Sequence, residues 1–184
     1  MKQHIETFFD QVRSGEIEIY NEFSLQHELG IFLRNLMPNH KVQFERNVSF
    51  FEYQKSNLYK KEIDITISGR ENGRPMCALE LKYPRNGQVP ESMYSFCKDI
   101  AFLEQLVNIG FEVAYFIAVA DDKLFYSGSS SGIYAMFRGD QSISGVINKP
   151  TGTKDTSVNI HGSYQASWVP VAGTTKYCLI QVGS

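Results

Sequence analysis

The feature that most constrains this fold is a long helical segment between two stretches typical of buried strands. Pro90 suits the first turn of a helix, and an apolar stripe then follows one helical face as far as Gly110, which suits a helix end. Residues 111–120 are almost continuously apolar, as expected for a strand covered on both faces. A helix of this length between two strands predicts a right-handed crossover and therefore a parallel strand pair.

The chain before this unit predicts two helices and three strands. Apolar residues recur at helical spacing in residues 5–12 and in residues 22–36, where Ser24 is a candidate cap. Alternating apolar and polar residues predict strands over 42–50 and 62–67, and the turn at 68–75 predicts a hairpin onto a third strand, 76–83. The expected order is α-β-β-β-α-β, an α/β fold with a mixed central sheet flanked by helices.

Composition changes near residue 127. The last 58 residues hold 8 of the 14 glycines and a Ser-rich stretch at 127–132. Short apolar alternations at 164–168 and 178–182 indicate added strands. We therefore expect residues 1–126 to form the core with its N-terminal helices, and residues 127–184 to form a β-rich C-terminal extension packed on it.

Charge and apolar content exclude several classes of protein. The chain has 184 residues and a formal net charge of −2, so it lacks the strong basicity of proteins that wrap nucleic acid; only residues 41–85, with nine Lys or Arg against six Asp or Glu, are locally basic. No apolar stretch approaches the ~20 residues of a membrane-spanning helix, and acids lie near the start, where a signal peptide would be apolar. We expect a cytoplasmic protein without membrane contact. The three cysteines have no CxxC spacing and are expected to be buried thiols.

The chemistry that the sequence suggests centres on the predicted hairpin. If its turn is centred near Asn72, the numbers of directly opposed residues sum to 144, so Asp64 lies opposite Glu80. Glu62 then lies opposite Lys82. Opposed carboxylates repel, and a divalent cation such as Mg²⁺, which prefers carboxylate oxygens, removes that repulsion. With a lysine beside it, such an ion suits the hydrolysis of a phosphodiester.

These residues resemble a known family of enzymes. An acid in one strand, Asp64, followed by Glu80-Leu81-Lys82 in the next, within an α-β-β-β-α-β order, resembles the PD-(D/E)xK, or restriction-endonuclease-like, nuclease superfamily over roughly residues 20–126. The resemblance implies an enzyme, a metal-dependent nuclease that uses Mg²⁺ or Mn²⁺. It implies Asp64 and Glu80 as metal ligands, the Leu81 carbonyl as a backbone ligand, and Lys82 near the attacking water.

The resemblance also implies an outer metal ligand and a nucleic-acid partner. Families of this kind, such as archaeal Holliday-junction resolvases, often add a glutamate from the preceding helix, and Glu28 matches that position. Ile63 stands where the motif has its proline. The expected substrate is DNA, in defence or repair. Residues expected to contact its phosphates follow the third strand or belong to the basic segment: Arg85, Asn86, Lys60, Lys61, Arg70 and Arg74; solvated loops fit these residues equally well. Lys98 fits an exposed helix lysine better than a phosphate contact.

Two functions remain open from the sequence. One is the Mg²⁺-dependent nuclease, which the presence of Asp64, Glu80 and Lys82 favours. The other is a non-catalytic module with the nuclease fold that contacts a protein partner through its C-terminal extension, which the slightly acidic total charge favours. Three further choices are open: DNA or RNA as the substrate, internal or terminal cleavage, and a monomer or a homodimer that cuts both strands of a duplex.

Overall fold

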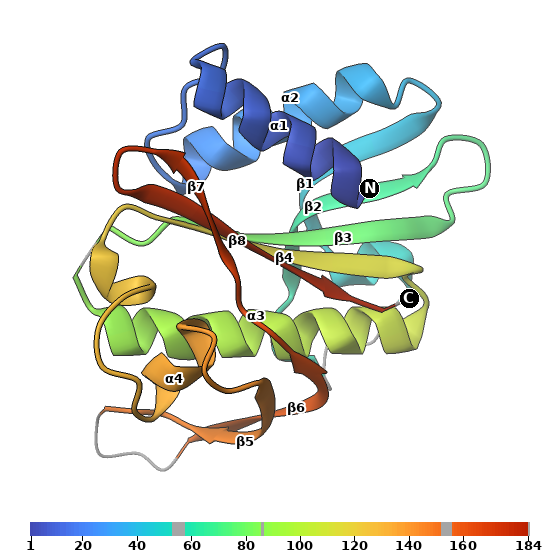
Figure 1. Ribbon diagram of the computed structural model, residues 1–184. Coiled ribbons are helices and arrows are strands. Elements are labelled where there is room, and N and C mark those ends of the chain that lie inside the picture. Colours follow the sequence, from blue (N-terminus) through green and yellow to red (C-terminus); the bar gives the residue numbers. More distant parts are fainter. Residues whose placement is uncertain (53–57, 86, 152–155, 184) are drawn as a thin grey trace.

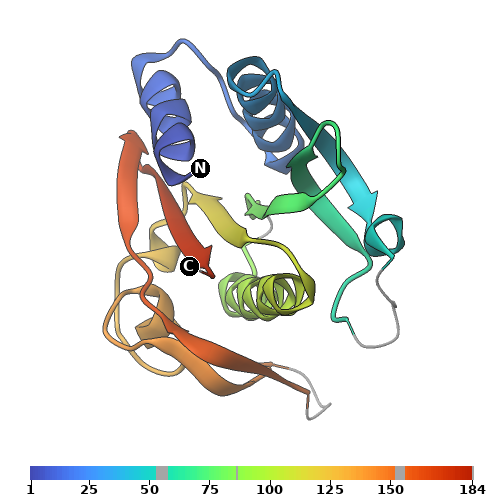
Figure 2. The same cartoon turned by 90° about the vertical axis from the view of Figure 1, so that its right-hand side faces the viewer.

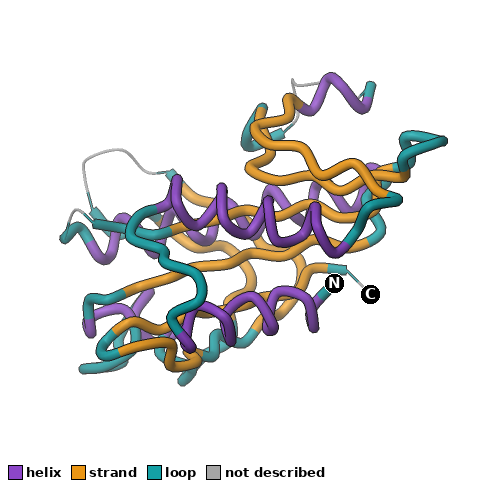
Figure 3. Tube along the Cα trace, turned by 90° about the horizontal axis from the view of Figure 1, so that it is seen from above, coloured by secondary structure: helices purple, strands orange, loops and turns teal. Residues whose placement is uncertain are grey.

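The computed structural model describes residues 1–52, 58–85, 87–151 and 156–183. The described chain has a mixed α/β fold in layers: two helices cover one face of a six-stranded mixed sheet, and one long helix covers the other (Figures 1 and 2). A two-stranded ribbon lies outside the long helix (Figure 2). The helices and the strands of the large sheet run along a common direction (Figure 3).

The elements follow the predicted order and continue past it. The helices are α1 (Lys2–Ser14), α2 (Glu22–Leu36), α3 (Val89–Ile109) and α4 (Ile133–Phe137). The strands are β1 (His40–Asn47), β2 (Glu62–Gly69), β3 (Pro75–Lys82), β4 (Val113–Ala120), β5 (Ile143–Asn148), β6 (Ser157–Tyr164), β7 (Trp168–Ala172) and β8 (Thr175–Val182). The large sheet has the order β1-β2-β3-β4-β8-β7, and β5-β6 form the ribbon.

The helix α2 has the predicted bounds but a different cap. Asn21 is the N-cap, and its side chain accepts a hydrogen bond from the Ser24 amide at 2.8 Å. The Ser24 hydroxyl in turn accepts one from the Asn21 amide at 3.0 Å, which makes a capping box. Gly30 lets α2 lie close to the sheet, since a Cβ there would come within 2.0 Å of the Phe44 ring on β1. α2 therefore packs closely against β1.

The first strand is shorter than predicted. β1 ends at Asn47, and Val48–Phe51 form a short 3₁₀ helix, η1, in place of the expected continuation to residue 50. The Asn47 side chain accepts a hydrogen bond from the Ser49 amide at 3.1 Å and so starts the turn. The Val48 amide donates to the Lys61 carbonyl at 2.9 Å, which brings the chain just before β2 alongside the turn.

The register of the hairpin β2–β3 is the predicted one. Ile65 pairs with Leu79, Thr66 with Ala78, and Ile67 with Cys77, and the register shifts only beyond Ile67. β4 pairs with β3 in parallel, which confirms the expected parallel pair around α3. Because the register is kept at Ile65 and Leu79, the next two residues toward the open end of the hairpin are Asp64 and Glu80.

The C-terminal segment shares the large sheet with the first 126 residues. β8 pairs antiparallel with β4, from Ala114 and Val182 to Ala120 and Lys176, and β7 forms the edge beside it. The ribbon β5–β6 packs on the outer side of α3, where Val158 and Ile160 are buried in the core of that face (Figure 2). The three cysteines are free and buried, as expected. Among the residues that the structure describes, no helix has the length and apolarity needed to cross a membrane.

Candidate functional site

Asp64 and Glu80 lie together at the open end of the hairpin. The backbone pairing of the two strands ends at Ile65 and Leu79. Beyond it, the Asp64 Oδ2 atom accepts a hydrogen bond from the Leu81 amide at 2.7 Å, so a side-chain hydrogen bond takes the place of a backbone one. Glu80 is fully buried, whereas 16% of the Asp64 side chain is exposed. The hairpin therefore brings the two carboxylates together, as the predicted register requires, with Glu80 inside the protein and Asp64 at its surface.

Lys60 places its ammonium among three carboxylates. Its Nζ atom contacts the Oε2 atom of Glu80 and lies 3.1 Å from Asp99 Oδ1 and 4.0 Å from Asp64 Oδ1. Asp99 comes from α3, where its side chain is only 3% exposed. The sequence suggested Lys60 only as a surface contact and did not suggest Asp99. The structure makes both residues part of one partly buried charged group, which we call the acidic cluster: Asp64, Glu80 and Asp99 with Lys60.

Lys82 lies at the edge of the acidic cluster and is held from three directions. Its Nζ atom donates to the Leu81 carbonyl at 2.9 Å and lies 3.6 Å from Asp99 Oδ2 and 3.3 Å from Glu22 Oε1. The other carboxylate oxygen of Glu22 accepts the Tyr83 amide at 3.1 Å. Lys82 is 18% exposed. The carboxylate that α2 brings to this place is therefore Glu22, its first residue.

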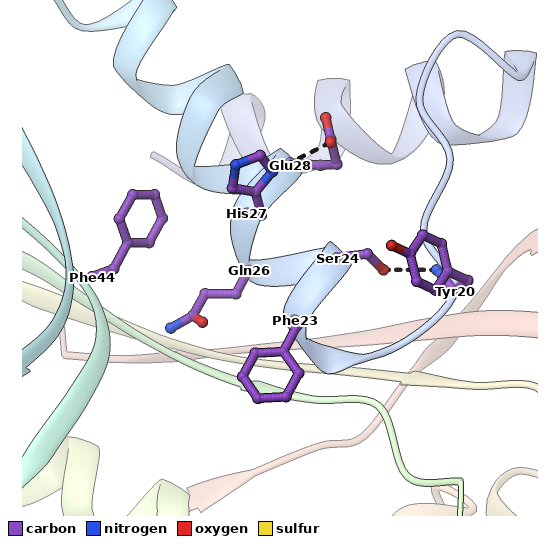
Figure 4. Close-up of a pocket in the computed structure, with 7 residues that line it drawn as sticks. All are labelled: Tyr20, Phe23, Ser24, Gln26, His27, Glu28 and Phe44. Carbon is purple, nitrogen blue, oxygen red and sulfur yellow. Dashed lines mark hydrogen bonds and ion pairs between the residues drawn. The ribbon is translucent and has the colours of Figure 1, made fainter.

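Glu28 is not brought to the acidic cluster. Its carboxylate lies 3.5 Å from His27 Nδ1, on the rim of a pocket of about 410 Å³ beside α2 (Figure 4). Gln26 leaves the helix toward the hairpin instead and donates to the Asp64 carbonyl at 2.8 Å (Figure 4). Residues four positions apart in a helix share a face, so Glu22 and Gln26 both face the hairpin. Residues two positions apart, such as Gln26 and Glu28, point about 200° away from each other around the helix axis, so Glu28 does not face the hairpin.

The charges in this region are unbalanced in favour of the acids. Four carboxylates, of Glu22, Asp64, Glu80 and Asp99, face the two ammonium groups of Lys60 and Lys82. Burial, with the nearby charges of Asp64 and Asp99, raises the pKa of Glu80 well above its usual value. Burial also raises the pKa of Asp99, although the positive charges of Lys82 and Lys60 lower it in part. The region therefore favours the uptake of a further positive charge, a proton or a cation.

The donor atoms fit a hard divalent ion in part. Within the described residues, Glu80 Oε1 and Asp99 Oδ2 are buried without a hydrogen-bond partner, and carboxylate oxygens are the ligands that Mg²⁺ prefers. In the same part of the chain, no group of three or more His, Cys, Asp or Glu side chains is arranged to hold a metal ion. The Lys60 ammonium occupies the space between the carboxylates, so a metal ion would take its place.

The residues expected to contact phosphates do not form one surface. Arg85, at the same end of the sheet as Lys82, pairs with Asp121 at 2.6 Å and is 53% exposed. Lys61 is exposed beside Lys60. Asn86 lies outside the described residues. The remaining two, Arg70 and Arg74, flank the turn of the hairpin at the opposite end of the strands.

The site is thus assembled from segments far apart in the sequence. α2 contributes Glu22, the hairpin contributes Asp64, Glu80 and Lys82, and α3 contributes Asp99 (Figure 1). They converge because β3 lies inside the sheet and is covered by α3 on the face that carries Glu80. Comparisons of the chain with protein-family models, with curated proteins and with solved structures found no match.

Proposed function

We propose that this protein is a metal-dependent nuclease of the PD-(D/E)xK type that hydrolyses phosphodiester bonds in DNA. The observation that carries the proposal is the convergence of Asp64, Glu80 and Lys82 at one end of the hairpin, with carboxylates in excess over ammonium groups. The strand order β1-β2-β3-β4, with β4 parallel to β3, supports it further.

The acids suit the binding of one divalent ion. Asp64 and Glu80 would hold it, and the Leu81 carbonyl, which accepts from Lys82 in this structure, would be the backbone ligand. When bound, the ion supplies a polarised phosphoryl oxygen and a water of lowered pKa. The buried Glu80 Oε1 atom, which lacks a hydrogen-bond partner among the described residues, supports this assignment.

Lys82 is positioned for the charge that develops on the phosphate. Burial lowers its pKa, but the charges of Asp99 and Glu22 outweigh burial and raise the pKa above its usual value, so the side chain stays an ammonium at neutral pH. An ammonium fixed beside the reacting group stabilises negative charge that grows in the transition state. Asp99 and Glu22 fix the direction of this side chain from opposite sides and act as positioning residues.

One observation favours a second function, a non-catalytic module with the same fold. The Lys60 ammonium already lies among the three carboxylates of the acidic cluster, which an ion would otherwise neutralise. In such a module the acidic cluster would be a structural salt-bridge network, and the protein would act by contacting a partner. This function predicts neither cleavage nor a metal requirement.

A nuclease assay separates the two functions. Supercoiled plasmid and a branched DNA are incubated with the protein in Mg²⁺, in Mn²⁺ and in EDTA. The nuclease predicts cleavage that needs a metal ion and is lost in Asp64→Asn. Cleavage by Asp64→Asn at the wild-type rate, or no cleavage of either DNA by the wild type, contradicts the proposal.

A further inference from the structure

Two hollows meet on the exposed side of α3, next to the proposed site. The first, of about 300 Å³, includes Glu22 and Lys82 from the site. The second, of about 470 Å³, lies farther along and includes Lys98 from α3 and Lys149, the residue after β5. Both hollows are lined by Glu91 and Ser95 of α3. The two hollows therefore adjoin at these residues, and we call them together the α3 groove.

The C-terminal segment forms the far wall of the α3 groove. Lys149, Thr156 and Ser157, which lie at the ends of the ribbon strands β5 and β6, line it together with residues of α3. Tyr59, which is 43% exposed, lines the same part and immediately precedes Lys60. The groove thus joins Lys82, at the edge of the acidic cluster, to the region of the chain that the nuclease motif does not cover.

The charges of the α3 groove change along its length. Next to the site, the Lys82 ammonium is engaged by Glu22 and Asp99. Farther along, Lys98 is exposed, and Lys149 pairs with Glu91 at 3.5 Å with about a third of each side chain exposed. Two lysines against one glutamate leave a positive balance at the end of the groove away from the site.

We propose that the α3 groove binds the phosphate backbone of one nucleic-acid strand, with Lys98 and Lys149 as its phosphate contacts. This inference rests on the proposed nuclease function, because it assumes that a scissile phosphate lies at Lys82. Lysines and hydroxyl groups are the usual partners of backbone phosphates, and Ser92, Ser95 and Ser157 line the same groove. The carboxylate of Glu91 repels the phosphates of the nucleic-acid strand, and in the free protein it pairs with Lys149.

The length of the groove matches a short stretch of backbone. From Ser92 to Lys98 the helix rises about 9 Å at 1.5 Å per residue. Phosphates follow one another about every 3.4 Å of axial rise along one strand of a duplex. Because the covalent backbone between successive phosphates is longer than this axial rise, a groove of this length accommodates one or two phosphates beside the one at Lys82.

The test measures the affinity of the full chain for a fluorescein-labelled single strand and for its duplex, by anisotropy in Ca²⁺ at several salt concentrations. The variants are Lys98→Gln, Lys149→Gln and Glu91→Gln, with Lys123→Gln as the matched control. Lys123 is exposed and lies outside the groove, and its variant has the same net charge as the two lysine variants. Melting temperatures confirm that each variant folds.

We expect the lysine variants to weaken binding about threefold or more each, and to reduce the salt slope of log Kd by about 0.7 for a single strand or about 0.9 for a duplex. Glu91→Gln changes the net charge in the opposite direction and is expected to tighten binding, because it removes a negative charge and frees Lys149. Lys123→Gln is expected to retain the wild-type affinity apart from the small effect of net charge.

The outcomes separate this inference from the proposed function. If the wild type cleaves DNA but Lys98→Gln and Lys149→Gln bind like Lys123→Gln, the groove is not the path of the strand and the nuclease stands. If Glu91→Gln weakens binding, its pair with Lys149 shapes the groove and the assignment of Lys149 as a phosphate contact fails. If the wild type binds neither form of the DNA, the proposed function fails, and the inference with it.

Discussion

Two buried acids on the same helix show how differently carboxylates are used in this protein. Glu104 of α3 is 7% exposed and accepts three hydrogen bonds, from the His161 and Gly162 amides at 2.9 and 2.6 Å and from the Tyr164 hydroxyl at 2.9 Å. Asp99, just over one turn earlier, lies between two lysines, and its Oδ2 atom has no hydrogen-bond partner among the described residues.

The difference distinguishes an acid that serves the fold from acids that are available for chemistry. Glu104 fastens α3 to the ribbon β5–β6, and Gly162 is required there, because a Cβ at that position would come within 2.5 Å of the Tyr164 hydroxyl. Its oxygens are fully used by fixed donors. In the acidic cluster, three carboxylates share the single ammonium of Lys60, so an added ion or substrate can change their partners.

The largest expected effect is on cleavage. Asp64→Asn, Glu80→Gln and Lys82→Ala should each reduce the rate of cleavage about 10²- to 10⁴-fold. Removing one member of a catalytic unit costs nearly as much rate as removing all of its members. Glu104→Gln, assayed below its melting temperature, should cleave at close to the wild-type rate. Rates are measured on plasmid DNA in Mg²⁺. An equal loss in Glu104→Gln would remove the distinction between the two acids.

The next effect is on stability, at the structural acid. Glu104→Gln should lower the free energy of unfolding by about 2–3 kcal/mol, because the amide presents one acceptor oxygen in place of two. Its NH₂ group then faces either the His161 amide or the Gly162 amide with the Tyr164 hydroxyl, all of which are donors. The loss should be the same in EDTA and in Mn²⁺, since this residue is not expected to meet the ion. Denaturant unfolding in the two buffers provides the measurement, and a loss seen only in Mn²⁺ would contradict the structural role.

Lys60→Met should separate the stability of the acidic cluster from its affinity for metal. Without metal, the variant should melt at a lower temperature than the wild type, because three carboxylates lose the ammonium between them. Its Mn²⁺ affinity, measured by calorimetry, should rise about tenfold or more, since the ion no longer has to displace the Lys60 ammonium from among the carboxylates. Lys61→Met, at the exposed neighbouring residue, is the control. A Mn²⁺ affinity in Lys60→Met no higher than in Lys61→Met would show that Lys60 and the ion do not compete.

The smallest effect is a pH dependence in EDTA. The pKa of Glu80 is higher in the folded protein than its usual 4.5, so its contribution to stability is present below pH 4.5 and is lost as the pH rises through the folded-state pKa. Glu80→Gln removes this loss. We expect the metal-free variant to be as stable as the wild type at pH 7 or more stable by about 0.5–2 kcal/mol, with a weaker decline of stability above pH 4.5. Urea unfolding at a series of pH values tests this, and a clearly less stable variant would make Glu80 a structural acid like Glu104.

The parts of the fold that were predicted correctly depend on local patterns. The bounds of α2 follow from a helical apolar period, and the register of β2–β3 follows from a turn centred near Asn72, so both are readable from neighbouring residues. The end of β1 was missed, because the Asn47 side chain competes with the strand ladder in a sequence that still alternates. The cap at Asn21 was missed for a similar reason, since Ser24 takes part in the same capping box.

The candidate site was only partly predictable, because its members come from segments whose relative placement the sequence does not contain. Asp64 and Glu80 share a hairpin, and the register alone brings them together. Glu28 was expected at the site and Glu22 was not considered; which of the two faces the hairpin depends on how α2 is rotated against it, and no local pattern reveals that rotation. Asp99 did carry a signal: it lies three residues after Phe96 and four before Leu103, on the apolar stripe of α3. A charged residue on such a stripe requires a partner inside the protein.

The place of β8 in the large sheet also has a consequence for how the chain folds. β4 pairs with β3 on one side and with β8 on the other, yet β8 is made last, after the whole ribbon β5–β6. Until it is in place, an apolar strand with unpaired backbone groups stays open along one edge, which is the kind of edge that pairs with other chains. A chain shortened to residues 1–126 would keep Asp64, Glu80 and Lys82 but expose that edge permanently, so the residues of the site would be carried by an aggregation-prone molecule.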